Sequence, residues 1–258
     1  MKAVVLGGTK GMGRALARQL VTRGDRVFLL GRDRADLERS AQDLQARAGA
    51  TEAGRAATAT AMPTPIGFAA CDLENPDGFA RALDEADAAL GGFDTVVVTA
   101  GLFATQDRLE GDLMLTRRLL TVDFANTVVF CEEVRRRLLS RGGGTLCVFS
   151  SVAGERGRKP VILYGAAKAG LTHYLDGLDF KFRAAGLRTI CVKPGFVKTG
   201  MTEGLKTPPF AGTAEGVAAS VVKALDRGTP VVYAPAIWAL IMLVIRSLPR
   251  LVMRRIGF

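Results

Sequence analysis

The 258-residue sequence has few groups that could hold a fold together covalently or through a metal. It contains one histidine and four cysteines, which stand singly inside apolar runs at Cys71, Cys131, Cys147 and Cys191. Without paired CxxC spacing these cysteines indicate no disulfide framework, and one histidine cannot complete a zinc site with them. We therefore expect no metal centre and a reducing, cytosolic compartment.

Signal-peptide and nucleic-acid-binding patterns are also missing. The run Lys2–Leu6 has the composition of a strand and leads directly into a glycine-rich turn, so we expect no signal peptide and a cytoplasmic protein. Lysine and arginine number 35 against 25 acidic residues, but no basic run is interleaved with aromatic residues. The excess charge therefore favours an anionic cofactor and gives no support to a nucleic-acid partner.

Short apolar runs alternate with longer helical patterns, which is typical of repeated βαβ units around a parallel sheet. We expect an α/β Rossmann fold with a doubly wound, seven-stranded parallel sheet flanked by helices. The expected strands are Ala3–Leu6, Arg26–Leu30, Ile66–Ala70, Thr95–Thr99, Thr145–Phe149, Thr189–Val192 and Val231–Ala234. The expected helices are Gly11–Arg23, Ala35–Ala48, Asp77–Leu90, Asp112–Arg141 and Leu163–Ala185.

One catalytic domain is expected over residues 1–235. Residues 49–65 are rich in Ala, Thr, Gly and Pro without periodicity, and we interpret them as a surface insertion. Residues 199–212 are irregular and glycine- and proline-bearing, which is typical of a substrate lid. Residues 236–258 form a separate apolar and basic C-terminal segment.

The turn after the first strand carries the pattern of a phosphate site. Glycines in this position let backbone amides approach a pyrophosphate, and the following helix offers unpaired N–H groups to the anion. The alternative is an ordinary tight turn, but its place between a strand and a helix favours dinucleotide binding. The residues expected to contact the cofactor here are Gly7, Thr9, Lys10, Gly11, Met12 and Gly13.

The second strand is followed by Gly31 and Arg32 rather than by an acid. An acid here would hold the ribose 2′-hydroxyl of NAD, whereas an arginine accommodates a 2′-phosphate, and Lys10 can add a second positive charge. NADP(H) is therefore favoured over NAD(H), although Asp33 could cancel part of the charge. After the third strand, Asp72 and its neighbour Leu73 are placed to contact the adenine.

Three polar residues carry the expected chemistry. Tyr164 and Lys168 stand four residues apart, on one helix face, and Ser151 precedes the tyrosine by thirteen positions. A lysine ammonium favours the phenolate of a nearby tyrosine and brings a phenol closer to the working range of an acid–base catalyst. Tyr164 would then donate a proton to a carbonyl oxygen that Ser151 binds.

With these motifs the sequence resembles the short-chain dehydrogenase/reductase family from about Met1 to Val232. Further matches are Ala100 and Gly101, at the end of the family's N-N-A-G turn, and a P-G-x-V-x-T segment whose expected nicotinamide contacts are Pro194, Gly195, Val197 and Thr199. Two features depart from the family pattern. Val98-Thr99 replace two asparagines of the turn, and Asp123 stands where the family has a catalytic asparagine. The resemblance implies that Asp123 retains this role or that Asn126 replaces it.

The substrate side is less defined. Met201, Leu205 and Phe210 in the lid could face an apolar substrate or pack on the helix below. The apolar run 236–245 is followed by arginines, which suits attachment to the anionic inner face of the cell membrane. The alternatives are that this segment forms a dimer contact or a helix packed over the substrate cleft. The helices 112–141 and 163–185 could pair two-fold, so a homodimer or homotetramer is expected.

The segment Ser150–Arg158 together with this terminus is similar to the decaprenylphosphoryl-2-keto-ribose reductases of cell-wall arabinose synthesis. Arg156, Arg158 and Lys159 would then either meet a phosphate or be solvated. A reductase of another lipid-like ketone, including a soluble 3-oxoacyl reductase, fits nearly as well. A different class of function also stays open, a non-catalytic NADP(H)-binding sensor or scaffold, since Val98, Thr99 and Asp123 replace polar residues of the family pattern.

Overall fold

The computed structural model describes residues 1–50 and 65–256. Seven parallel strands form one sheet in the order β3-β2-β1-β4-β5-β6-β9, which confirms the expected doubly wound Rossmann arrangement. The strands are β1 Lys2–Leu6, β2 Arg26–Gly31, β3 Gly67–Ala70, β4 Thr95–Val98, β5 Gly144–Phe149, β6 Leu187–Pro194 and β9 Val231–Ala234.

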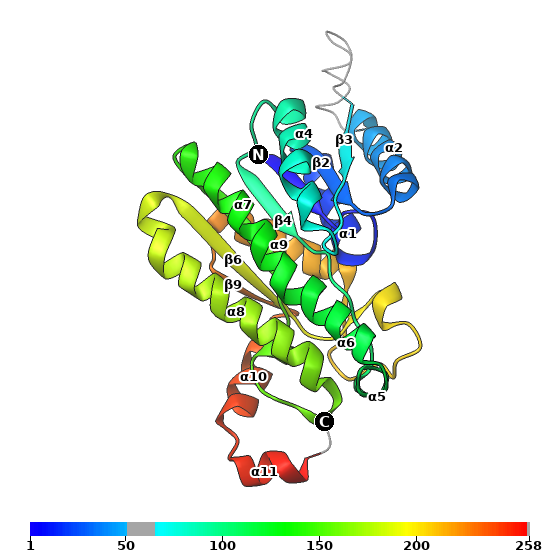
Figure 1. The fold of residues 1–258 in the computed structure, drawn as a ribbon, viewed down its shortest axis with the longest axis vertical. Helices are drawn as coiled ribbons and strands as arrows, with labels where there is room; N and C mark the ends of the chain where they lie inside the picture. The colour runs from blue at the N-terminus through cyan, green and yellow to red at the C-terminus, as the bar shows by residue number, and fades with distance from the viewer. Residues whose placement is uncertain (51–64, 257–258) are drawn as a thin grey trace.

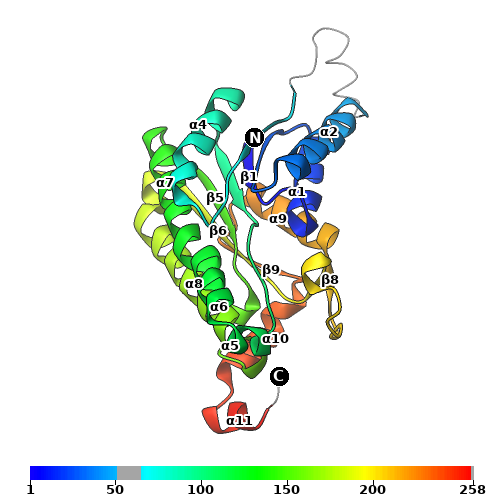
Figure 2. The ribbon, with the colours of Figure 1, turned by 45° about the vertical axis from the view of Figure 1, so that its right-hand side comes forward.

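Helices cover both faces of the sheet (Figures 1 and 2). One layer holds α1 Gly11–Thr22, α2 Arg34–Ala50 and α9 Ala214–Arg227, and the other holds α4 Phe79–Leu90, α7 Asn126–Ser140 and α8 Ile162–Phe182. Successive side chains of a strand point to opposite faces of the sheet, so alternate residues of β1 pack against different helix layers. Val4 and Leu6 pack against the layer that contains α4, and Ala3 and Val5 pack against the layer that contains α1.

The single helix expected over 112–141 is interrupted. The structure has α6 Leu113–Leu120, a π-helical turn Thr121–Ala125 and then α7. The residues remain helical throughout, so hydrophobic periodicity could not reveal the wider turn. The π turn places Asp123 in the interior with 1% exposure, in keeping with the frequent occurrence of such bulges at functional sites.

The other segments lie around the end of the sheet where the strands finish. Helix α5 Gln106–Gly111 precedes α6, and a two-stranded ladder of β7 Val197–Lys198 with β8 Gly212–Thr213 closes the base of the expected lid. All but the edges of the expected insertion 49–65 lies outside the described residues.

The C-terminal segment forms two short helices, α10 Ile237–Ser247 and α11 Arg250–Arg255, separated at Pro249. The expected apolar run is thus helical, but it does not continue into the arginines as one amphipathic helix. Within the described residues, every helix is too short or too polar to cross a lipid bilayer.

Candidate active site

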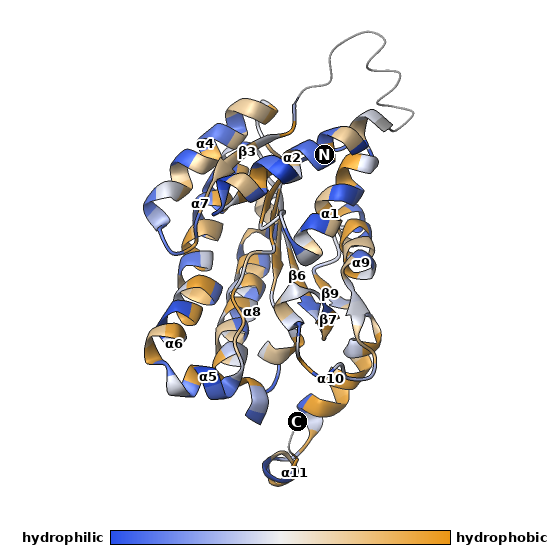
Figure 3. Cartoon of the chain, turned by 90° about the vertical axis from the view of Figure 1, so that its right-hand side faces the viewer, coloured by the Kyte–Doolittle hydropathy of each residue, from blue (hydrophilic) through white to orange (hydrophobic). Residues whose placement is uncertain are grey.

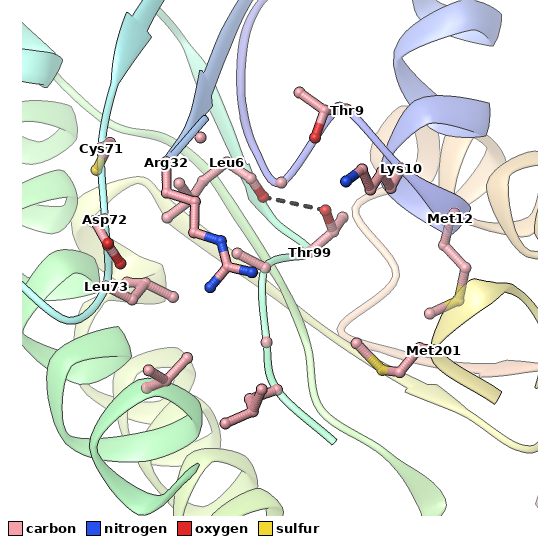
Figure 4. Close-up of a pocket in the computed structure, with 18 of the residues that line it drawn as sticks. Leu6, Thr9, Lys10, Met12, Arg32, Cys71, Asp72, Leu73, Thr99 and Met201 are labelled. Atoms are coloured by element: carbon pink, nitrogen blue, oxygen red, sulfur yellow. Dashed lines mark hydrogen bonds between the residues drawn. The ribbon is translucent and has the colours of Figure 1, made fainter. Parts of the chain in front are cut away.

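A cavity of about 320 Å³ lies at the carboxyl ends of β1 to β4. The strand order reverses between β1 and β4, and ligands of open α/β sheets bind at this reversal. Figure 4 shows Arg32 extending into the cavity, with Asp72 and Leu73 on one side and Lys10 and Met12 on the other. The predicted cofactor residues in its wall are Gly7, Thr9, Lys10, Gly11, Met12, Gly13, Arg32, Asp72, Leu73, Ala100, Gly101 and Thr199.

The glycine turn is tight and closely packed. Gly7 has a φ of 93°, and a side chain there would meet the backbone nitrogen of Ala100 at 2.6 Å. A side chain at Gly13 would collide with the carbonyl of Gly7, so α1 packs closely against the turn. Lys10 precedes α1 without a side-chain cap, which leaves the helix N–H groups available to an anion.

The two cations expected to bind a 2′-phosphate line the cavity, but each has a carboxylate neighbour. Lys10 Nζ lies 2.8 Å from Asp36, and Arg32 lies 3.9 Å from Glu74. Asp33, expected as a competitor for Arg32, instead accepts a hydrogen bond from the backbone N–H of Asp36 at the start of α2. The positive charge near the end of β2 is therefore tempered by Glu74 rather than by Asp33.

Among the residues of this wall that sequence reasoning missed, two are charged. Arg118 on α6 binds Glu74 at 2.6 Å, and both line the cavity. Glu74 stands two residues after Asp72, and this position just after the third strand could have identified it as a residue of the cavity wall. Arg118 gave no signal, because its contact joins two segments 44 residues apart. Asp72 accepts a hydrogen bond from the Glu74 N–H at 2.9 Å and so helps to shape this turn.

The predicted catalytic residues come together where β5 meets α8. Ser151 follows β5 and caps a 3-10 turn, Val152–Gly154, by accepting the N–H of Ala153 at 3.1 Å. This turn packs on α8 so closely that a side chain at Gly154 would meet the backbone of Lys168. Tyr164, on α8, stands edge-to-face with Phe103 at 5.2 Å between ring centroids.

Lys168 and Asp123 form a buried ion pair with 3.4 Å between Nζ and Oδ2, and their side chains are 5% and 0% exposed. The other carboxylate oxygen accepts the backbone N–H of Leu102 at 2.6 Å. Gly101, in the cavity wall, lies against both charged groups, since a side chain there would meet each within 3.5 Å. The pair therefore adjoins the inner end of the cavity.

The electrostatics of the predicted catalytic set are dominated by burial. Burial raises the pKa of Tyr164 above its ordinary value. Lys168 lowers this pKa, as expected, and a hydrogen bond with Ser151 lowers it as well. Asp123 raises it again, so the pKa stays above its ordinary value. Burial lowers the pKa of Lys168, but Asp123 and Tyr164 more than offset this and raise it. The lysine thus keeps its charge, while the phenol keeps its proton at neutral pH.

Several predicted contacts lie outside the cavity wall. Pro194, Gly195, Val197, Tyr164 and Lys168, all predicted to contact the cofactor, are not part of that wall. The carbonyl of Pro194 instead lies 3.5 Å from the Ser151 hydroxyl, and Gly195 packs against Trp238. Among the lid residues, Met201 lines the cavity. Leu205 and Phe210 do not, and Phe210 is 61% exposed, so of these three predicted residues Met201 alone lies at the cavity.

Other expected roles are corrected by the contacts. Asn126 cannot replace Asp123 beside Lys168, because its amide donates to the Leu73 carbonyl at 2.6 Å. Arg156 is half-buried and Lys159 is exposed, and both also contact the chain. They donate to the backbone carbonyls of Leu248 and Arg254, both at 2.9 Å, and so hold the C-terminal segment.

A glycine turn at a topological switch point, beside a half-buried tyrosine and a buried lysine, defines a dinucleotide-dependent oxidoreductase. The family model described as short chain dehydrogenase matches residues 1–209. The chain belongs to the short-chain dehydrogenase/reductase family and is an NAD(P)-dependent oxidoreductase acting on CH–OH groups.

Individual relatives agree with this assignment. An uncharacterized oxidoreductase of Mycobacterium tuberculosis is 35% identical over 254 residues, covering 98% of this chain and 95% of the relative. A cis-4-hydroxycyclohexanecarboxylate dehydrogenase of Sinomonas cyclohexanicum is 30% identical over 204 residues, covering 79% and 76%. An actinorhodin polyketide ketoreductase solved with NADPH shares the fold, with a TM-score of 0.76, 20% identity, and coverage of 90% of this chain and 94% of that chain.

Proposed function

We propose that the protein is an NADP(H)-dependent carbonyl reductase that acts on an apolar or lipid-linked ketone and can oxidise the matching alcohol. The observation that carries this proposal is the joint placement of Ser151, Tyr164 and Lys168. Ser151 lowers the pKa of the Tyr164 phenol, and the Lys168 ammonium lies 5.6 Å from the centroid of the phenol ring. The same ammonium lies against Gly101 in the cavity wall.

NADPH bound along the glycine turn would supply a hydride to the carbonyl carbon. Tyr164 donates its proton to the carbonyl oxygen, and Ser151 donates a hydrogen bond to the same oxygen as negative charge develops there. Lys168, held by Asp123, stabilises the phenolate that remains until water restores its proton. Because burial keeps the pKa of Tyr164 high, the phenol is protonated at neutral pH, which favours reduction over oxidation.

The preference for NADP(H) rests on Arg32 and Lys10, which both line the cavity. A 2′-phosphate would compete with Glu74 for the Arg32 guanidinium, and this competition is favourable because the existing 3.9 Å pair is exposed and weak. The related ketoreductase, solved with NADPH, is a precedent for this cofactor on the same fold.

The proposal extends to substrate and assembly. Met201 in the cavity wall and the exposed apolar side chains of the lid favour an apolar substrate. A homodimer or homotetramer would pair α7 with its two-fold copy, and Val129 on this helix is 46% exposed. A peripheral position at the inner membrane face fits the C-terminal segment.

Tyr164→Phe tests the catalytic assignment. We expect it to lower kcat/KM for a ketone found by screening chain lengths and headgroups with NADPH by at least about 100-fold, because the proton donor is lost. Tyr174→Phe is the matched control on the same helix, since its hydroxyl binds Glu132 outside the site. Full turnover by Tyr164→Phe would refute the proposal.

A non-catalytic NADP(H) sensor is the second candidate, and one observation favours it. Asp123 raises the pKa of Tyr164, which makes phenolate formation harder than it would be beside a neutral asparagine. Tight NADPH binding in calorimetry, combined with no NADPH consumption across the whole ketone panel, would support the sensor.

A further inference from the structure

Exposed apolar side chains gather at the end of the molecule where the parallel strands finish. Figures 1 and 2 place α5, α10 and α11 at this end, and Figure 3 shows apolar residues along α10. Single exposed leucines are ordinary, but a group of them marks an interface. The exposed large apolar residues of α6, α10, α11 and the lid are Leu113, Met114, Met201, Phe210, Ile237, Leu240, Leu243, Val244, Leu251 and Val252.

Helix α10 is apolar on two faces. Its inner face contributes Met242 and Ile245, which are buried against Val152, the residue after Ser151. Its outer face leaves Leu240 and Val244 60% and 56% exposed. The inner contacts explain why the helix stays on the protein, but nothing in the described chain covers the outer face.

Helix α11 carries charge beside this apolar face. It buries no residue and leaves Leu251 68% exposed, yet Arg156 and Lys159 anchor the segment through its backbone carbonyls. No acid follows Asp226 in the sequence, whereas arginines stand at positions 246, 250, 254 and 255. The segment is therefore both apolar and strongly cationic.

The first turn of α6 provides a second apolar contact at the same end. Leu113 and Met114 are 78% and 73% exposed, more than the exposed residues of α10. Further along this helix Arg118 lines the cavity, which Met201 of the lid also lines. The lid in turn touches α10, where Trp238 donates to the carbonyl of Phe210. The cleft thus lies between the α6 contact and the α10–α11 contact.

The charge pattern decides which partner fits. A two-fold contact between two copies of the chain would bring the arginines of one α11 close to those of the other α11, and like charges repel. An anionic bilayer instead accepts both the apolar side chains and the arginines. The α5–α6 hairpin adds no net attraction, because its acids balance its arginines, so the electrostatic contribution comes from the C-terminal segment.

We infer that the active-site end of the protein docks on an anionic bilayer through two contacts, the outer face of α10–α11 and the first turn of α6, and that the cleft between them opens toward the lipid. A ketone in the bilayer would then enter the cleft without crossing water. Docking stands on the exposed surface alone, whereas the entry of a ketone rests on the proposed function.

Vesicle sedimentation tests the docking. We expect wild-type protein to pellet with vesicles of phosphatidylcholine and phosphatidylglycerol much more than with phosphatidylcholine alone. Leu240→Gln/Val244→Gln and Leu113→Gln/Met114→Gln should each weaken binding at least about tenfold, because each removes apolar side chains from the contact. Phe180→Gln is the matched control: this side chain on α8 is 85% exposed and lies outside both contacts.

A charge series sharpens the result. Arg250→Gln and Arg254→Gln should each lower binding to anionic vesicles by about fivefold and leave the weak binding to neutral vesicles unchanged. Arg136→Gln is the control, an arginine on α7 with 65% side-chain exposure. Thermal unfolding of every variant shows whether the fold is kept.

Three outcomes would overturn the inference. The first is wild-type protein that never pellets with anionic vesicles. The second is a smaller oligomer for Leu240→Gln/Val244→Gln in light scattering, which would assign α10 to a contact between copies. The third is unchanged binding by Leu113→Gln/Met114→Gln, which would remove the second contact and with it the orientation of the cleft.

The inference and the proposed function fail separately. Tyr164→Phe should pellet with vesicles like wild type while losing turnover, so a catalytic failure leaves docking intact. Leu240→Gln/Val244→Gln should keep its turnover on a water-soluble ketone and lose it on a ketone embedded in vesicles. Equal loss on both ketones would show that the variant damages the site rather than docking.

Discussion

Among the pairs of opposite charges near the cavity, Lys168–Asp123 and Arg32–Glu74 differ most clearly in how far water reaches them. Lys168 and Asp123 are 3.4 Å apart and almost fully buried. Arg32 and Glu74 are 3.9 Å apart, with side chains 65% and 36% exposed. The separations are similar, but charges attract far more strongly where the effective dielectric is low. The buried pair can therefore fix a catalytic group, while the exposed pair can exchange partners with a ligand.

The largest effect is expected from Lys168→Met. Removing the cation leaves the Asp123 carboxyl buried without a counter-charge, and this should lower the free energy of unfolding by about 3 kcal/mol at neutral pH. The pKa of Asp123 is already raised by burial, and it rises further without the ammonium. A folded-state pKa above the unfolded one means that stability is lost as pH rises, so the defect should shrink on acidification.

Urea unfolding at about pH 8 and about pH 5 measures this change. The double variant Lys168→Met/Asp123→Asn is the control, because it removes both charges and should recover much of the lost stability. Equal instability of the single and double variants would show that lost packing, and not the unpaired carboxyl, is responsible.

At the exposed pair, Arg32→Ala should weaken NADPH binding by about tenfold and leave NADH binding nearly unchanged, because only NADPH offers a 2′-phosphate to the guanidinium. Calorimetry with both cofactors measures the two affinities. Arg34→Ala is a neighbouring control, since Arg34 stacks over Phe68 rather than lining the cavity. Equal losses for the two cofactors would break the argument for the 2′-phosphate.

Asp123→Asn tests the effect of the buried carboxylate on the pKa of Tyr164. The amide keeps an oxygen for the Leu102 N–H but removes a charge that raises the pKa of Tyr164. Alcohol oxidation needs the phenolate, so its rate should rise at neutral pH and the rising limb of its pH profile should move to lower pH. Asp107→Asn, an exposed change on α5, should leave the profile in place; a shift toward higher pH for Asp123→Asn would contradict the assignment.

The smallest effect is expected from Glu74→Gln. Removing this exposed carboxylate frees Arg32 for a phosphate and should strengthen NADPH binding by no more than about fivefold, the usual scale of an exposed ion pair. Raised salt should narrow the difference between variant and wild type. Weaker NADPH binding by Glu74→Gln would show that the glutamate positions Arg32 instead of competing for it.

Local patterns predicted the fold because each is a property of neighbouring residues. The apolar strands, the glycine turn before α1 and the four-residue spacing of Tyr164 and Lys168 were all visible in the chain. Two features of the site were not. The π turn that carries Asp123 inward has the same residue types as a regular helix, and the contact of Arg118 with Glu74 joins residues far apart in sequence.

The sequence by itself determined the sheet, the glycine turn and the three polar residues offered for catalysis, because periodicity and spacing act through the nearest neighbours along the chain. Only the tertiary structure decided that Asp123 faces Lys168, that Asn126 is held elsewhere, and that Arg156 and Lys159 bind the C-terminal segment. These outcomes depend on burial and on contacts between distant segments, which arise when the helices pack against the sheet.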